Sequence, residues 1–220
     1  MKKRKKVFEI SEIKKHYERF DDDRIRIIAK NEAKGLRNEI IPILTEEIKK
    51  RNLGDHLIKW INAERRKLST SEFELLKRKV KNSICVSCKQ SRNLKGYEFS
   101  AVTGVLIGEI VTDYRLIICE KCGKKRRRNS AIWTAVFGWW SAKGLIWTPL
   151  VLINTVKAVI QEEKQSGEII KSFIESHIGR ITLGKDSEDV IQKLLKEFNG
   201  SEDFDEFDDI QTDGKEDGAP

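Results

Sequence analysis

The chain has 220 residues, of which 35% are charged and 39% are hydrophobic, a balance that suits a folded protein with a modest core and excludes disorder throughout. The net charge of +8 is unevenly distributed. Residues 201–220 contain nine acids and one lysine, a charge of −8, so residues 1–200 carry +16. A body this basic is expected to bind anions: nucleic acid, an anionic membrane surface or its own tail.

Residues 1–82 are predicted to be a basic start followed by a small helical bundle. Apolar residues recur at three-to-four-residue spacing through this segment, as one buried helix face requires. Gly54 suits the end of a helix, and Asp55 is a candidate cap for the next one. Ser69 and Glu72 have the spacing of a capping box, which predicts a further helix start.

Residues 83–130 contain all four cysteines of the chain, in two Cys-x-x-Cys pairs. The segments 97–102 and 110–118 are rich in β-branched and aromatic residues, which predicts a β-hairpin between the pairs. The hairpin returns the chain to the first pair, and Gly123 fits a knuckle turn after the second. Two such pairs provide the four thiolates of a tetrahedral Zn²⁺ site in a zinc ribbon. The predicted zinc ligands are Cys85, Cys88, Cys119 and Cys122.

The predicted zinc is structural, because four cysteines leave no open position for a bound water. Redox-active pairs, another metal and buried unliganded thiols are the alternatives. A redox pair is expected to open a helix in a β-α-β setting, which neither pair is predicted to do. The basic residues at the start of the chain are not followed by an apolar run, so no secretory signal is expected. Paired cysteines without such a signal favour a reducing compartment, the cytoplasm or the inner face of the membrane.

Basic residues precede the most apolar part of the chain: Lys121, Lys124, Lys125, Arg126, Arg127 and Arg128. Residues 131–160 are predicted to form an apolar helix that holds four of the five tryptophans: Trp133, Trp139, Trp140 and Trp147. This combination is typical of contact with an anionic membrane surface. Lys143 lies within the stretch, where a charge disfavours a membrane span. A single span or shallow hairpin, and a core helix of a soluble domain, are the alternatives.

Three motifs besides the cysteine pairs carry a resemblance: Lys95-Gly96-Tyr97-Glu98 between the pairs, and Phe137-Gly138-Trp139-Trp140 and Gly144-Leu145-Ile146-Trp147-Thr148-Pro149 after them. With the cysteine pairs they resemble a module of bacterial proteins of unassigned function. In that module a zinc ribbon precedes an Phe-Gly-Trp-Trp element that ends in Gly-x-Ile-x-Thr-Pro. The resemblance covers about residues 85–155. It implies metal binding, and it implies neither an activity nor a partner.

The sequence therefore predicts an α+β fold with a helical N-terminal bundle, a zinc-ribbon β-hairpin, an apolar Trp-rich helix and C-terminal helices. The C-terminal helices are expected in residues 161–199, and residues 200–220 are predicted to be a disordered acidic tail. No catalytic constellation stands out, so the protein is predicted not to be an enzyme, and no small-molecule substrate is inferred. The predicted function is docking on an anionic membrane surface or a partner protein. Nucleic-acid binding, with the acidic tail as an intramolecular competitor, is the alternative.

Overall fold

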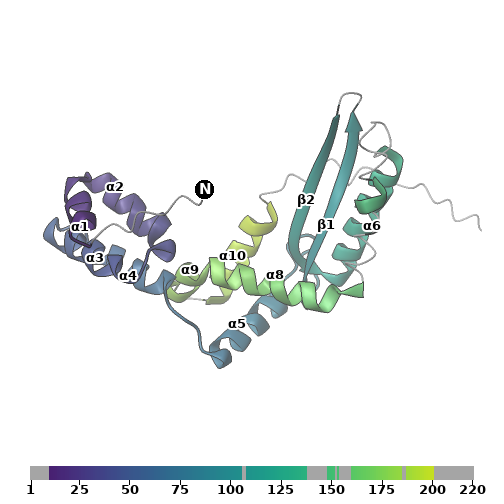
Figure 1. The fold of residues 1–220 in the computed structure, drawn as a ribbon. Helices are drawn as coiled ribbons and strands as arrows, with labels where there is room; N and C mark the ends of the chain where they lie inside the picture. Colours follow the sequence, from purple (N-terminus) through teal and green to yellow (C-terminus); the bar gives the residue numbers. More distant parts are fainter. Residues whose placement is uncertain are drawn as a thin grey trace, which may run out of the picture. The chain divides into compact units, whose positions relative to one another are not determined.

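The computed structural model describes residues 10–105, 108–137, 148–151, 153, 160–184 and 187–200 (Figure 1). The described part contains helices and one antiparallel hairpin, which confirms the predicted α+β class. The chain forms two compact units that alternate in sequence. The first comprises Met1–Glu72 and Ser176–Val190, and the second comprises Phe73–Glu175 and Ile191–Pro220.

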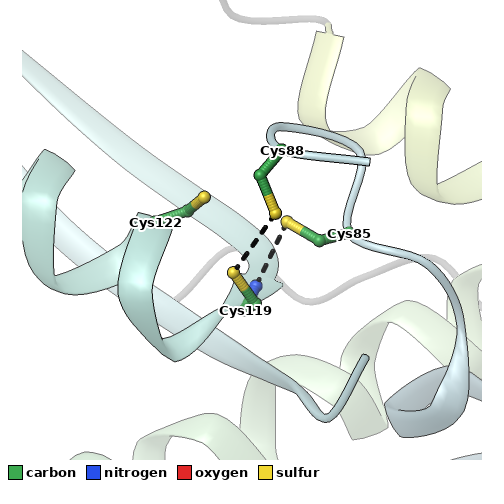
Figure 2. Close-up of side chains that lie close together, drawn as sticks. All are labelled: Cys85, Cys88, Cys119 and Cys122. Carbon is green, nitrogen blue, oxygen red and sulfur yellow. Dashed lines mark hydrogen bonds between the residues drawn. The ribbon is translucent and has the colours of Figure 1, made fainter. Parts of the chain in front are cut away.

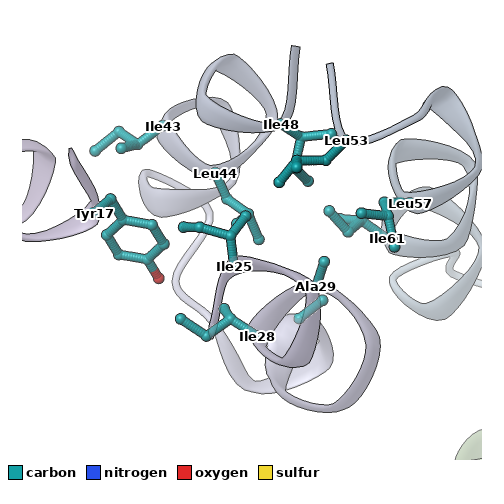
Figure 3. Packing of buried hydrophobic residues seen from close by; sticks show 11 residues of the cluster. Tyr17, Ile25, Ile28, Ala29, Ile43, Leu44, Ile48, Leu53, Leu57 and Ile61 are labelled. Atoms are coloured by element: carbon teal, nitrogen blue, oxygen red, sulfur yellow. The ribbon is translucent and has the colours of Figure 1, made fainter. Parts of the chain in front are cut away.

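The first unit is a bundle of short helices, as predicted. Its elements are α1 (Ile10–Arg19), α2 (Asp22–Ile27), the π-helical turn η1 (Ile28–Glu32), the 3-10 turn η2 (Ala33–Gly35), α3 (Ile40–Lys50), α4 (Asp55–Glu64) and α9 (Ile178–Leu183). Apolar side chains from α1 to α4 form the core in Figure 3, where Ile25, Leu44 and Ile61 are fully buried. The helix α9 comes from the C-terminal part of the chain and packs on α4.

The chain leaves α3 through Asn52, which has a φ of 53°. The amide of Leu53 donates to the carbonyl of Ile48 at 3.0 Å, as in a helix that ends with a left-handed residue. Gly54 lies just before α4, and Asp55 is the first residue of that helix. The prediction that Gly54 ends one helix and Asp55 caps the next was therefore wrong. Asparagine also adopts the left-handed conformation, so a nearby glycine is not needed for it.

The helix α5 (Thr70–Asn82) begins at the predicted capping box. The Ser69 amide donates to Glu72 Oε2 at 2.9 Å, and the Glu72 amide donates to Ser69 Oγ at 3.3 Å. These reciprocal hydrogen bonds satisfy two backbone donors at the start of the helix and confirm the prediction. Hydrogen bonds from Ser69 also hold the pKa of Glu72 below its ordinary value.

The second unit is built on the hairpin of β1 (Leu94–Val105) and β2 (Gly108–Cys119). The strands are paired from Leu94 opposite Cys119 to Val105 opposite Gly108, which confirms the predicted hairpin. The helix α6 (Glu120–Phe137) follows β2 directly and lies along β1 (Figure 1). Two further helices contact the strands near Cys119: α8 (Glu162–Ser176) and the second half of α10 (Ser187–Gly200).

The helix α6 is continuous across residue 130, where the sequence predicted a boundary between the zinc ribbon and an apolar helix. Its buried positions recur every three or four residues: Gly123, Arg127, Ser130 and Thr134. The predicted boundary lies inside the helix because lysine and arginine favour helix as well as most apolar residues do. The change from a basic to an apolar composition near residue 130 therefore does not mark the end of a helix.

Gly123 lies in α6, next to the ring of Tyr97 on β1. A Cβ at position 123 would lie 2.3 Å from this ring, so only glycine permits the contact. The expectation that Gly123 belongs to a knuckle turn was wrong. Its role is to let the hairpin and the helix approach each other closely.

Candidate metal centre

The four cysteines meet at the end of the hairpin opposite its turn (Figure 2). Their sulfur atoms all lie within 4.8 Å of one another. Cys85 and Cys88 come from the segment between α5 and β1. Cys119 is the last residue of β2, and Cys122 lies in the first turn of α6. The predicted convergence of the two pairs is confirmed, and the cluster can hold a metal ion.

The first pair lies in a tight turn stabilised by backbone hydrogen bonds. The Lys89 amide donates to the Cys85 carbonyl at 2.8 Å, and the Cys85 amide donates to the Ser91 carbonyl at 2.8 Å. Lys89 has a φ of 57°, in the left-handed region. The turn therefore holds the side chains of Cys85 and Cys88 toward the same point.

The second pair spans a junction between strand and helix. Positions three apart on a helix share a face, so the first turn of α6 brings Cys122 to the side of Cys119. The Cys119 amide donates to Cys85 Sγ at 3.4 Å, which joins the two pairs directly. Sequence periodicity did not reveal this junction, because the residues after Cys119 are charged and carry no apolar stripe.

The thiols differ in their protonation. Burial raises the pKa of Cys85, and it raises the pKa of Cys122 to about 12. Amides of Gln90 and Ser91 donate to the sulfur of Cys88 and lower its pKa to about 6. Four sulfurs this close repel one another as thiolates, and a bound cation removes that repulsion.

Ion pairs connect the metal centre to α8. Lys95 Nζ lies 3.5 Å from carboxylate oxygens of both Glu120 and Glu162. Arg127 is 8% exposed, pairs with Glu162 at 3.0 Å and places its guanidinium 5.7 Å from the centroid of the Tyr97 ring. Arg127 was predicted to bind an anion at the surface, and the structure places it inside this network. The pairing of Lys95 with Glu162 was not predicted from the sequence, because nothing local pairs positions so far apart.

The exposed side of α6 combines positive charge with apolar surface. Four basic residues of α6 are spaced at i, i+3, i+4 and i+7, so they share one face of the helix. This face lies opposite the buried positions. Two apolar residues continue the same face further along, and they are 45% and 53% exposed. We call this set the outer face of α6: Lys121, Lys124, Lys125, Arg128, Ile132 and Val136. Lys124 also pairs with Glu120, and Arg126 lies to one side and is half-buried.

Trp133 is the one predicted docking tryptophan in the described part of the chain. Its Nε1 donates to Thr103 Oγ1 at 3.0 Å, and its ring centroid lies 4.2 Å from that of Phe137. Trp133 is therefore partly engaged with the hairpin. No helix among the described residues is long and apolar enough to cross a membrane. The other tryptophans, whose predicted role stays a prediction, lie outside the described residues: Trp139, Trp140 and Trp147.

Comparisons with known proteins assign no family to the chain. Protein-family models, curated proteins and solved structures were all searched, and none matches. The resemblance to a bacterial zinc-ribbon module therefore rests on its sequence motifs alone. The fold and the site define the class: an α+β protein with a four-cysteine cluster at metal-binding distance beside a basic helix.

Proposed function

We propose that this protein is a non-catalytic docking module that binds an anionic membrane surface through the outer face of α6. In this proposal a structural Zn²⁺ ion at the four cysteines holds α6 against the hairpin and fixes the direction of that face. The observation that carries the proposal is the position of the basic residues, which begin at Lys121, next to Cys122, and share one exposed side of the helix.

The donor set supports zinc. Zn²⁺ prefers four thiolates in a tetrahedron at about 2.3 Å, which places neighbouring sulfurs about 3.8 Å apart. Cys88 Sγ and Cys119 Sγ are 3.8 Å apart, and all four sulfurs lie within 4.8 Å. Cys85, Cys88, Cys119 and Cys122 would fill the shell, so the ion would stabilise the fold and would not bind a substrate.

The mixed character of the outer face supports a membrane as the partner. Each lysine or arginine near an anionic bilayer contributes about 1 kcal/mol, and exposed apolar side chains beside them add to the binding by entering the interface. Ile132 and Val136 provide such side chains on the same face as the basic residues. A phosphate backbone alone would leave these two residues in water.

Nucleic acid is the second candidate, favoured by the narrow basic stripe itself. Lys121, Lys125 and Arg128 lie on successive turns of one helix and can contact successive phosphates. Affinity would then depend on charge, fall steeply with salt and be indifferent to the apolar residues.

The zinc part is tested by metal analysis of protein prepared without chelators. We expect one Zn²⁺ per chain, and we expect Cys122→Ser to lose the ion and much of the cooperativity of unfolding, because metal binding is coupled to folding. Ser87→Ala, a change inside the first turn that leaves all four sulfurs in place, is the control and should retain zinc. Protein that folds cooperatively without any bound metal would contradict the assignment.

The docking part is tested with vesicles of anionic and of neutral lipid, and with single-stranded RNA. Replacing Lys121, Lys125 and Arg128 by glutamine should weaken binding to anionic vesicles about a hundredfold, at about 1 kcal/mol for each charge. The matched control replaces Lys49, Lys50 and Lys59 of the first unit and should change little. Ile132→Ser with Val136→Ser separates the two candidates, because it should weaken binding to vesicles and leave binding to RNA unchanged. Absence of vesicle binding by the intact chain would remove the membrane from the proposal.

A further inference from the structure

Two side-chain amides of α10 bind the backbone beside the two cysteine pairs. The Ile84 amide donates to Gln192 Oε1 at 3.1 Å, and Gln192 Nε2 donates to the Ile84 carbonyl at 3.0 Å. The Ile117 amide donates to Asn199 Oδ1 at 2.8 Å, and Asn199 Nδ2 donates to the Ile117 carbonyl at 3.2 Å. Each side chain therefore pairs with both polar groups of one residue, as a neighbouring strand would.

The two bound residues lie next to cysteines of the metal centre. Ile84 directly precedes Cys85, and Ile117 lies two positions before Cys119. Ile84 and Cys85 belong to neither a helix nor a strand, so no regular backbone ladder fixes this part of the chain. The two contacts thus join α10 to segments 108 and 82 residues away in the sequence, one beside each cysteine pair.

Hydrogen bonds at the outer edge of β1 are of a different kind. Hydroxyl groups from α6 and α8 meet backbone groups of this strand at 2.9–3.1 Å: Ser166 accepts from the Gly96 amide, Thr134 accepts from the Val102 amide, and Ser130 donates to the Ser100 carbonyl. In each of these contacts a hydroxyl bonds one backbone group, whereas Gln192 and Asn199 each bond two on a single residue. Because hydrogen bonds are directional, two of them fix the orientation of that residue's backbone as well as its position.

One helix carries both amides. Gln192 and Asn199 are seven residues apart, so they lie on the same face of α10, about 10.5 Å apart along its axis. Leu195 lies between them on this face and is fully buried. Asn199 Nδ2 also donates to the Leu195 carbonyl at 2.6 Å, which holds this side chain against its own helix. The spacing of the two amides along α10 therefore sets the separation of the two bound segments.

We propose that Gln192 and Asn199 are positioning residues of the metal centre, which hold the two cysteine pairs at ligand distance through α10. This inference rests on the proposed zinc site and identifies residues outside the four ligands that raise its affinity. Groups behind metal ligands commonly change metal affinity about 10–100-fold when they are removed, because they orient the ligands. Coupling between two sites is reciprocal, so a bound ion would in turn stabilise the docking of α10 on the hairpin.

The first test measures the Zn²⁺ affinity of the full chain by competition with a chelator of known affinity. Asn199→Ala and Gln192→Ala should each lower it about tenfold, the lower end of that range, because both residues act through the backbone. Alanine favours helix more than asparagine or glutamine does, so a weaker helix cannot cause the loss. Lys196→Ala, at an exposed position of the same helix, is the matched control and should change little. Gln192→Glu keeps the oxygen that accepts from Ile84 and removes the donor, so its affinity should lie between those of wild type and Gln192→Ala.

The second test separates positioning from general stability, with Co²⁺ in place of Zn²⁺. The visible absorption bands of Co²⁺ report the geometry of its four sulfur ligands. Asn199→Ala should shift these bands. Leu194→Ala removes a side chain that is 2% exposed and leaves both amides in place, so it should lower the free energy of unfolding and leave the bands unchanged.

The outcomes distinguish this inference from the zinc site on which it rests. Unchanged Zn²⁺ affinity in Asn199→Ala and Gln192→Ala would overturn the inference alone. Unchanged Co²⁺ bands in Asn199→Ala, or an equal shift in Leu194→Ala, would do the same. An intact chain that binds neither Zn²⁺ nor Co²⁺ would overturn the zinc site, and the inference with it.

Discussion

Gly123 has no side chain, and this allows the hairpin and α6 to lie close together. Tyr97 is buried among the strands and the helix, and its ring occupies the space in which any side chain at position 123 would lie. Its hydroxyl has no hydrogen-bond partner among the described residues, and burial raises its pKa. The contact lies next to Cys122, so it also positions one ligand of the metal centre.

Gly123→Ala should destabilise the zinc-loaded protein by about 1–3 kcal/mol, the usual range for overpacking. The measurement is urea unfolding at constant zinc concentration. Adding Tyr97→Leu should recover part of the loss, because the smaller side chain frees the space. Gly167→Ala is the control in α8: a Cβ there meets nothing within 4 Å, so it should stabilise by about 0.5–1 kcal/mol. A neutral Gly123→Ala would mean that the close contact does not hold the helix in place.

The helix α6 has two chemically different sides. Its buried side provides Arg127 to the ion network and hydroxyls to the edge of β1, and its exposed side provides the outer face. In the capping box of α5, the side chains of Ser69 and Glu72 each accept a hydrogen bond from the other residue's backbone amide at the helix start. Both elements depend on side chains placed at helical spacing.

The capping box predicts a pH dependence for α5. The pKa of Glu72 is lowered in the folded chain, so its contribution to stability is fully present above the ordinary value of 4.5 and is lost as the pH falls through the lowered value. Wild type should therefore be more stable than Glu72→Gln at neutral pH, and the difference should shrink as the pH falls below 4.5. Thermal unfolding across this range measures it. Glu74→Gln on the same helix is the control, and an equal loss there would argue against the box.

The two compact units are assembled from four stretches of sequence. The charge of the chain has a different division, between a basic body in residues 1–200 and an acidic tail in residues 201–220. We expect a −8 segment tethered to a +16 body to compete with external anions, because the tether gives it a high effective concentration. The competition is electrostatic, so salt should weaken it.

Deleting residues 201–220 should strengthen binding to anionic vesicles, and the gain should be larger at low salt. Co-sedimentation with vesicles at two salt concentrations measures both effects. A full-length variant with the tail acids replaced by asparagine and glutamine should behave like the deletion, because the competition depends on the charge of the tail and not on its length. Equal affinities of the intact and shortened chains would exclude the tail as a competitor.

The four-cysteine cluster and the hairpin could be predicted because their signals are local. Two Cys-x-x-Cys pairs and two β-branched segments are readable within a few residues each. The helix at Cys122, the burial of Arg127 and the closure of β1 by Ser130, Thr134 and Ser166 could not be predicted. The helix at Cys122 was missed because the residues after Cys119 are charged and carry no apolar stripe. The burial of Arg127 and the closure of β1 depend on partners 30 or more residues away, and the sequence of a basic stretch does not show whether its members face water or an internal carboxylate.

The position of the metal centre has a consequence for the alignment of the two strands. The last described pair of the hairpin joins Val105 and Gly108 at one end, and an ion shared by Cys85 and Cys119, 34 residues apart, would fix the strands at the other. A slip of two residues is the smallest that keeps each side chain on its own face of the sheet, and it would shift Cys119 by about 7 Å. The thiol would then lie outside the 4.8 Å cluster. A bound ion would therefore fix the alignment of β1 with β2, and we expect a chain without the metal to lose this constraint on how one strand pairs with the other.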